Sequence, residues 1–543
     1  MSTSAITYPE RKKAAMYAKM DIWQSRAARL LVILLICVHP LYMNMLPLEK
    51  YVRLTGHKYV FFCVCMSVVL LSVLIIWAMR MASNPRLLPQ DKLTIPDWAV
   101  LGFAAVTIIS AIFSPYRDVV NVWIGIPEPM GRYDGAITQL LYVAVFFIVS
   151  RWYRPRTNDF IVFGISASLV AIIGIFQFYG MDFLTLWPQH LPDFRVADAD
   201  KFYYIFFRTT LGNTNIVSTY ACAAILLCGF LFVRYTPPPG KKAGGKPSLV
   251  WWQPLWLVAS ALNFWLMDFG GADSGRIGML VAILFAVPFV VETIMALGRF
   301  LILASSWAAV YTLQRLFFEV NVLETRTTDS LLPYAAVVVL LLAAGLVLVK
   351  LGMERDEDAP AKWKVGVIMV VAIIATGIVG VEMLGRQDSE EGSVGNMMYE
   401  AREILHGNIQ DEFGTNRVYI WRNAIGEFPK NPIIGSGPDT FNAVFPEEAQ
   451  LFYGQNYDTA HNEYLQILIC QGILGLLFYL VFLAGVLVRP IPMAFKNPIV
   501  MAVLVAFVGY CAQAFFNISL PIASQLLWVF AGMLRGQGIG YRV

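Results

Sequence analysis

The chain has 543 residues, of which 58% are hydrophobic and only 14% are charged. Soluble globular chains carry about 25% charged residues, so this composition excludes an ordinary soluble enzyme. The net charge of +4 is small and no large basic cluster is present, which argues against a nucleic-acid partner. Apolar runs of about 20 residues match the length of helix that crosses a bilayer, and the short alternating runs of a β-barrel are not found.

The apolar runs predict an all-α fold, a polytopic membrane helical bundle of about 14 spans, with about 12 to 14 compatible with the pattern. Two runs, 252–268 and 300–318, are interrupted by polar groups, and the count depends on them. An even number of spans places both termini on the same side. The predicted spans are residues 28–47, 58–79, 97–113, 136–150, 159–179, 213–233, 252–268, 277–296, 300–318, 331–350, 365–384, 463–488, 498–516 and 520–535.

Lys and Arg concentrate in one set of connections between the spans, and such connections are normally cytoplasmic. The N-terminus and the C-terminal tail are therefore predicted to be cytoplasmic. The basic segments are Arg11–Lys13, Arg80–Lys92, Arg151–Arg156, Arg234–Lys246, Lys350–Lys364, Arg489–Lys496 and the tail with Arg535 and Arg542. The predicted division of the chain is a cytoplasmic N-terminal segment at 1–27, a membrane helical domain at 28–384, an extracytoplasmic loop at 385–462, and C-terminal membrane helices with a short cytoplasmic tail at 463–543.

The long outer loop lies between the fourth-last and third-last spans, and a histidine stands at its end. His461 opens the run His461-Asn462-Glu463-Tyr464-Leu465-Gln466, directly before an apolar span. Asp458 or Thr459 can cap that helix. A helix N-terminus disfavours positive charge, so a neutral imidazole that can accept a proton is expected. The alternative is an interfacial histidine that is hydrogen-bonded to its own loop.

Several arginines also lie in the predicted outer segments, against the positive-inside trend. They are Arg132, Arg208, Arg276, Arg417 and Arg422. Snorkelling can explain any one of them, but several together suggest binding of an anion such as a phosphate. Arg417 and Trp421 are i,i+4 neighbours and therefore share one face of a predicted helix.

Two other features of the outer segments are weaker signals. Asp198-Ala199-Asp200 is the one Asp-x-Asp pair and gives little support for a metal, so no metal site is expected. The Gly- and Pro-rich stretch Pro429–Pro438 predicts a turn with a structural role. It is not a phosphate-binding loop, because no strand precedes it and the Lys-Ser/Thr pair is absent.

Four motifs in and after the outer loop form a recognisable combination. They are Arg417-x-x-x-Trp421, Pro432-x-x-Gly435-x-Gly437, His461-Asn462-x-x-Leu465-Gln466 and Gln471-Gly472-Ile473-Leu474-Gly475. Together they resemble the O-antigen ligase and O-antigen polymerase superfamily of bacterial envelope glycan assembly. Further segments resemble the family from about residue 125 to 535: Gly131–Gly135 its Arg-x-x-Gly segment, Gly212-Asn213-Thr214-Asn215 its Gly-Asn-x-Asn segment, Ser274-Gly275-Arg276 its Ser-Arg segment with an inserted glycine, and Phe516-Asn517 and Trp528 its final spans.

The resemblance implies a GT-C-like helical membrane fold with the active site under an outer loop. It implies a membrane glycosyltransferase of the bacterial cytoplasmic (inner) membrane, acting on the periplasmic or extracellular side. The donor would be a glycan on undecaprenyl diphosphate, and the acceptor a hydroxyl of a glycan, lipid or protein. Neither a cofactor nor a metal would be needed, and direct attack by the acceptor would invert the anomeric centre.

The family's functional residues can be placed on matching positions of this chain. His461 matches the proposed general base, and Arg132, Arg276 and Arg417 match candidate diphosphate-binding arginines. Asn213, Asn215, Trp421 and Asn462 would support the site. The alternatives are a repeat-unit polymerase or a protein O-oligosaccharyltransferase of the same superfamily and, in another class, a lipid-linked glycan transporter or flippase.

Overall fold

The computed structural model describes residues 8–44, 54–83, 92–127, 132–178, 209–235, 252–270, 272–322, 332–354, 363–386, 394–452 and 457–536. Within these ranges every regular element is a helix, which confirms the all-α prediction. Arg208 and Asp198-Ala199-Asp200 lie outside the described residues. The main helices are α1 (Tyr8–Ile33), α3 (Leu54–Ser83), α4 (Ile95–Phe113), α5 (Ala136–Trp152), α6 (Thr157–Phe178), α8 (Thr214–Arg234), α9 (Trp252–Phe269), α10 (Asp273–Val290), α11 (Ile294–Val322), α12 (Leu332–Glu354), α13 (Trp363–Leu384), α14 (Val394–Leu405), α15 (Phe413–Glu427), α18 (Glu463–Val488), α20 (Pro498–Gln513) and α21 (Gln525–Gly536).

Short helical elements complete the described chain. They are the π-helical turn η1 (Leu34–Val38), α2 (His39–Leu41), the 3-10 turn η3 (Phe428–Lys430), α16 (Phe441–Val444), α17 (Glu447–Phe452), α19 (Ile491–Ala494) and the 3-10 turn η4 (Ala514–Phe516). In the described ranges, 11 helices are long and apolar enough to cross a membrane. Together with the shorter α5, and with α9 and α21, they occupy each of the predicted apolar runs. The protein is therefore a polytopic helical membrane protein.

The first helix differs from the prediction at both ends. α1 begins at Tyr8, so the boundary expected between residues 27 and 28 falls inside one continuous helix. The apolar span runs from Met16 to Leu41 and ends before the predicted residue 47. The polar residues at its start are good helix formers such as Lys, Arg, Ala and Glu, and therefore extend the helix rather than interrupt it.

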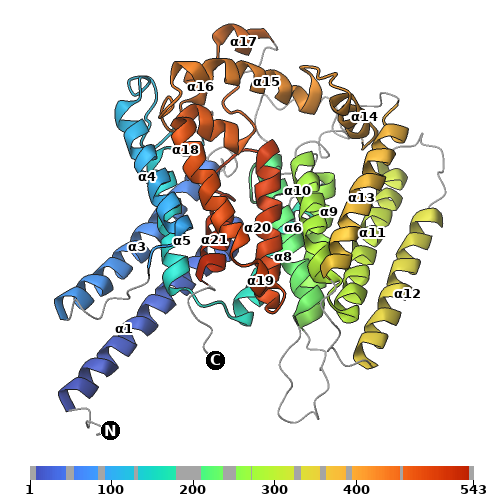
Figure 1. Cartoon of the computed structure of the whole chain (residues 1–543), viewed down its shortest axis with the longest axis horizontal. Helices are drawn as coiled ribbons and strands as arrows, with labels where there is room; N and C mark the ends of the chain where they lie inside the picture. The colour runs from blue at the N-terminus through green and yellow to red at the C-terminus, as the bar shows by residue number, and fades with distance from the viewer. Residues whose placement is uncertain are drawn as a thin grey trace.

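The centre of the bundle is α8, in which almost every residue is buried. A helix that is apolar on all sides is expected to be surrounded by other elements, and α8 packs against α9, α10, α11 and α20. Small residues allow close approach here: a Cβ on Gly278 of α10 would lie 2.6 Å from the carbonyl oxygen of Gly509 in α20. By contrast, α12 and α13 lie at one side of the bundle and expose nearly all of their apolar residues (Figure 1). These two helices present a lipid-facing surface.

The segment between α13 and α18 forms a layer over one end of the bundle, which we call the outer layer because the sequence predicts this end to be extracytoplasmic. It contains α14, α15, α16 and α17, which lie together at the top of the view in Figure 1. At the opposite end, Arg535 of α21 donates to Asp97 at the start of α4, with Nη2–Oδ2 at 2.8 Å. Arg151 at the end of α5 lies 3.4 Å from the same carboxylate. This ion cluster fixes α21, α4 and α5 together at the end predicted to be cytoplasmic.

α18 is interrupted by one residue with a non-helical backbone, Gly472. Gly472 has φ 69° and ψ −173°, which no helix contains. The Gly-rich turn docks in this break: the Ser436 and Gly437 amides donate to the Ile469 and Cys470 carbonyls at 3.0 and 2.9 Å. A Cβ on Gly472 would lie 2.4 Å from the backbone of Ile433. The structural role expected for the Pro429–Pro438 turn is therefore confirmed, because this turn joins the outer layer to a membrane helix.

The last predicted span, 520–535, is only partly helical. α21 has 12 residues, which is about 18 Å of helix and too short to cross a bilayer alone. Before it the chain descends in turns, where the Leu520 amide donates to Ser524 Oγ at 2.9 Å. Residues 520–536 are buried except for Gly536, which is half-buried. Non-helical backbone is tolerated at this depth because protein surrounds it and its polar groups are paired.

Candidate functional site at the outer end of the bundle

His461 lies directly before α18 in a strained backbone conformation. Its φ is +48°, a left-handed value that is uncommon for a residue with a side chain. The N-cap is Asn462, whose side chain accepts from the Leu465 amide at 3.0 Å. The expectation that Asp458 or Thr459 caps this helix is therefore wrong. Both residues have other partners, because Asp458 binds Arg132 and the Thr459 hydroxyl donates to Gln466 Oε1.

The backbone of Ala460, directly before His461, is held from two sides. The indole Nε1 of Trp421 on α15 donates to the Ala460 carbonyl at 2.9 Å. The Ala460 amide donates to Gln466 Oε1 in α18 at 3.0 Å. The Trp421 ring also packs at 5.4 Å, centroid to centroid, against Phe515 of the turn η4. α15 and α18 thus hold the backbone before His461 directly, and η4 packs against the Trp421 ring.

The imidazole of His461 is neutral over the physiological range. Burial, together with the positive charges of Arg132 and Arg417, lowers its pKa to about 3. The sequence predicted a neutral imidazole because of the helix N-terminus. In the structure, burial and the two arginines are the causes of the lowered pKa. Nδ1 is buried and has no hydrogen-bond partner among the described residues. The alternative of a histidine satisfied by its own loop therefore does not describe this atom.

Arg417 is the second group of the site. It follows Gly414, Thr415 and Asn416, which all have positive φ (64°, 60° and 63°) and form a kink at the start of α15. Its Nη1 donates to the Gly414 carbonyl at 2.6 Å. Its Nε is buried and finds no partner in the part of the chain that the structure describes. Burial lowers the pKa of this guanidinium, while Asp273 and Glu400 act in the opposite direction.

Arg132 reaches the same site from the segment between α4 and α5. Its guanidinium pairs with Asp458, with Nη2–Oδ1 at 2.5 Å and Nε–Oδ2 at 3.3 Å. This ion pair connects the Arg132 segment with the residues directly before His461. Arg132 and Arg417 therefore lie on different segments, and both are close enough to lower the pKa of His461.

Arg276 lies on the first turn of α10, and both of its terminal nitrogens have hydrogen-bond partners. It donates to Asp273 Oδ1 at 2.8 Å and, through Nη2, to the carbonyl and side chain of Asp268 at 2.6 and 3.0 Å. Asp273 also acts on the charge of Arg417, so Arg276 lies at the edge of the site. The inserted Gly275 has a steric reason, because a Cβ there would lie 2.3 Å from Ser218 Oγ on α8.

The asparagines of the Gly-Asn-x-Asn segment support helices at this end of the bundle. Asn213 caps α8 and accepts from the Asn215 amide at 2.8 Å. The Asn215 carbonyl accepts from Asn517 Nδ2 at 2.9 Å. Asn517 Nδ2 also lies 3.0 Å from Ser274 Oγ of α10. These contacts hold the helix that carries Arg276 and do not reach His461 directly.

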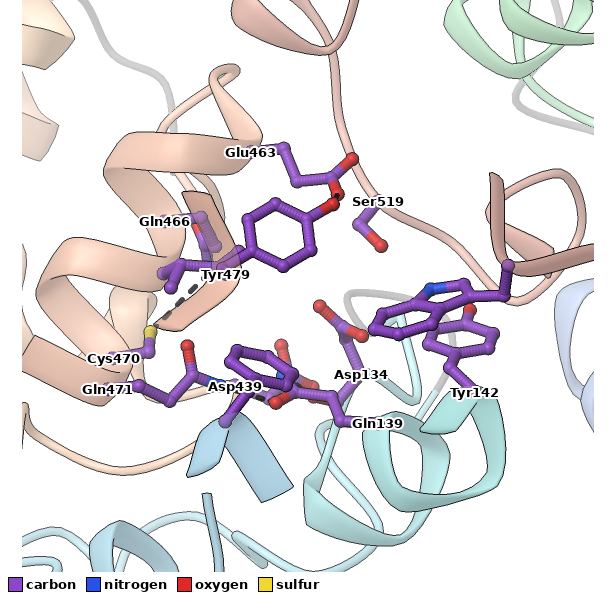
Figure 2. Close-up of a pocket in the computed structure, with 13 residues that line it drawn as sticks. Asp134, Gln139, Tyr142, Asp439, Glu463, Gln466, Cys470, Gln471, Tyr479 and Ser519 are labelled. Carbon is purple, nitrogen blue, oxygen red and sulfur yellow. Dashed lines mark hydrogen bonds between the residues drawn. The ribbon is translucent and has the colours of Figure 1, made fainter. Parts of the chain in front are cut away.

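A small cavity of about 30 Å³ lies beside the residues that follow His461, with Glu463 and Gln466 in its lining. Figure 2 shows Asp134, Asp439 and Glu463 among the polar side chains that line it. Burial raises the pKa of the Asp134 carboxyl well above its usual value, and Asp439 and Glu463 raise it further. Burial also raises the pKa of Asp439, to about 6. Such buried acids at the membrane boundary are expensive and are usually kept for a purpose.

Comparison with known families bears on this part of the chain. Residues 327–480 match the family model described as O-antigen ligase. This region is therefore similar to the O-antigen ligase family, in agreement with the resemblance seen in its motifs. No curated protein matches the chain. The matched region of this O-antigen ligase-like protein extends over α12, α13 and the outer layer into α18, and it contains Arg417, Trp421 and His461.

The O-antigen ligase match and the geometry meet on the same residues. His461, Arg417 and Trp421 lie inside the matched region, and Arg132 reaches them from outside it. The match supports an O-antigen ligase-like, glycan-processing membrane protein. The described residues contain no group of three or more His, Cys, Asp or Glu side chains that could hold a metal ion.

Sequence reasoning missed the acids of the site. Asp458 was considered only as a cap, while Asp134 and Asp439 were not singled out. A signal existed for Asp134, because it lies inside the Gly131–Gly135 motif. Asp439 follows the Gly-rich turn and carried no local signal, since its partners are more than 300 positions away in the chain.

Proposed function

We propose that this protein is a membrane glycosyltransferase that transfers a glycan from an undecaprenyl-diphosphate-linked donor to an acceptor hydroxyl on the outer face of the membrane. One observation carries the proposal. His461 Nδ1 and Arg417 Nε are both buried without a partner among the described residues, and the two groups interact electrostatically. Leaving a buried polar atom unsatisfied costs about 1 to 3 kcal/mol, so a pair of them at one site suggests groups kept for a ligand.

The histidine would act as the general base. The acceptor hydroxyl loses its proton to His461 while its oxygen forms a bond to the anomeric carbon of the donor. The bond from that carbon to the diphosphate oxygen breaks, and the lipid diphosphate leaves with the electron pair. Attack from the face opposite the leaving group inverts the anomeric centre. A positioned base of this kind contributes about 10² to 10⁴-fold to the rate.

The arginines would stabilise the leaving diphosphate. Guanidinium groups suit phosphate oxygens because their planar fork donates two parallel hydrogen bonds. Among the described residues, Arg417 Nε has no partner and is available for this purpose. Arg132 would give up one of its hydrogen bonds to Asp458 and donate to the diphosphate instead. The bound anion would offset the two positive neighbours of His461 and thereby raise its pKa, which makes it a stronger base. No metal or cofactor is required by this scheme.

The membrane location fits the donor, because a long isoprenoid chain stays in the bilayer while its diphosphate lies at the surface. The acceptor distinguishes the members of the superfamily. A sugar of lipid A core would indicate a ligase, a second repeat unit a polymerase, and a protein side chain an O-oligosaccharyltransferase. The arrangement of the outer site, with its base and arginines, favours transfer over a transporter, which would have charged groups in mid-span.

The test is reconstitution of the purified protein in liposomes with a labelled undecaprenyl-diphosphate-linked glycan and the three kinds of acceptor. The expected result is a covalent glycan–acceptor product together with released undecaprenyl diphosphate. Movement of the labelled donor between leaflets without a new bond would instead establish a flippase and reject the proposal.

A further inference from the structure

Asp439 is a buried acid at the junction of two outer segments. Its side chain is only 5% exposed, and its φ of +59° is a left-handed value tolerated best by Asp and Asn among residues with side chains. Its Oδ2 accepts from the Ile126 amide at 2.7 Å, and the Asp134 amide donates to the same side chain. A carboxylate that accepts two backbone amides is held firmly in place.

The two amides belong to the two ends of the loop that carries Arg132. Ile126 precedes this loop and Asp134 follows it, and the Tyr133 amide donates to the Ile126 carbonyl at 3.3 Å across its base. Gly125 lies against the acid so closely that a Cβ there would be 2.4 Å from Asp439 Oδ2. The Asp439 carboxylate therefore closes the base of the Arg132 loop.

On its other side, Asp439 is fixed to the helix that follows His461. The preceding Ser436 and Gly437 amides donate to carbonyls of α18, as described above for the break at Gly472. The Ser436 carbonyl also accepts from Ser114 Oγ at 2.5 Å. Asp439 therefore stands two residues after a turn that is hydrogen-bonded to α18, and its own side chain is hydrogen-bonded to the loop of Arg132.

We propose that Asp439 is a positioning residue that sets the place of Arg132 relative to His461. The inference rests on the proposed function, because it takes Arg132 as a ligand of the donor diphosphate. The charge on Asp439 is favoured by Arg132 itself, which lies close enough to lower the pKa of this acid. A displaced Arg132 would meet the diphosphate poorly, since transfer depends on sub-ångström placement of the binding groups.

The test is a double-mutant cycle in the reconstituted transfer assay, with Asp439→Asn, Arg132→Ala and the double variant. The carboxamide keeps the shape of the side chain but offers one oxygen for two amides. With Arg132 present, Asp439→Asn should lower kcat/KM for the donor at least about fivefold; in the Arg132→Ala background it should lower it less than about twofold. Equal losses in both backgrounds, or no loss in either, would overturn the inference.

Two further variants keep the result interpretable. Gly125→Ala disturbs the same junction from the loop side, so it serves if Asp439→Asn does not fold, and it should show the same non-additivity. Asp411→Asn is the matched control, because this acid of the outer layer pairs with Arg422 outside the site, and transfer should be unchanged. If the wild-type protein forms no product at all, the proposed function fails; product formation with additive losses removes only the role of Asp439.

Discussion

The indole of Trp421 donates to the carbonyl of Ala460 at 2.9 Å, so a residue of α15 holds the backbone immediately before His461. The amide of the same residue donates to Gln466 of α18. The conformation of His461, with its positive φ, is thereby imposed by its surroundings. Strain of this kind persists only where neighbouring contacts fix it, and it is concentrated at functional sites.

Trp421→Phe should slow glycan transfer about fivefold without unfolding the protein. The phenyl ring retains the contact with Phe515, but the hydrogen bond to Ala460 is lost. One such bond is worth about 1 kcal/mol, which corresponds to roughly fivefold. The rate is measured in the reconstituted assay. Trp98→Phe, at a 62% exposed position on α4, is the control and should leave the rate unchanged. An equal effect of both substitutions would contradict the role given to Trp421.

Arg417→Ala should lower kcat/KM for the donor by roughly 100-fold, the scale seen when one donor to a developing anion is removed. Arg417→Lys should recover part of this loss, because it restores the charge but not the planar fork. The matched control is Arg422→Ala on the same helix, whose side chain is 61% exposed and pairs with Asp411. Exposed ion pairs contribute little, so the control should stay within about twofold. A similar loss of kcat/KM in both alanine variants would show that Arg417 does not act as a specific ligand of the diphosphate.

Gly472→Ala should destabilise the protein by about 3 kcal/mol or prevent its folding. The substitution forces a side chain into a backbone conformation reserved for glycine and places a Cβ 2.4 Å from Ile433. Gly426→Ala is the control, because a Cβ at this helical position meets nothing within 4 Å. It should be neutral or slightly stabilising, since alanine favours helix. Thermal unfolding in detergent measures both, and equal melting temperatures would refute the account of the break in α18.

The pH dependence of stability should differ between the wild-type protein and His461→Gln. The folded protein resists protonation of His461 until about pH 3, whereas the unfolded chain takes up this proton near its ordinary pKa of 6.5. Between these values the unfolded state binds more protons, so His461 removes stability as the pH falls from about 6.5 toward 3. The Asp439 carboxyl, with its pKa raised to about 6, acts in the opposite direction in both proteins and cancels in the comparison. His461→Gln should therefore lose less thermal stability on going from about pH 7.5 to about pH 5. A parallel loss in both proteins would show that His461 is accessible to protons in the folded state.

The membrane helices could be predicted from the sequence because each apolar run had to form a helix in lipid. Part of the local geometry in the outer layer was also predictable, since Arg417 and Trp421 do lie on one helix and Trp421 reaches the residue before His461.

The break in α18 could not be predicted from the sequence. Gly472 lies inside a predicted membrane span, and its conformation depends on a turn that docks from the outer layer.

The acidic partners of the site were equally hidden, for a physical reason. Arg132 and Asp458 are 326 positions apart, and Ile126 and Asp439 are 313 apart, so no local pattern connects them. Arg276 stays a predicted diphosphate ligand that nothing in the structure tests. Its guanidinium pairs with Asp268 and Asp273, which the motif alone did not indicate. Motifs located the segments of the site, but only the packing of the bundle decides which side chains remain available to a ligand.

If His461 is the base of a glycan transfer reaction, its removal should stop product formation. Transfer from a labelled undecaprenyl-diphosphate-linked glycan is followed with purified wild-type protein and His461→Ala, both reconstituted at equal amounts and shown to be folded by thermal unfolding. Donor binding should survive in His461→Ala while the rate of product formation falls at least about 100-fold. Product formation by His461→Ala at the wild-type rate would contradict the role of His461 as the base.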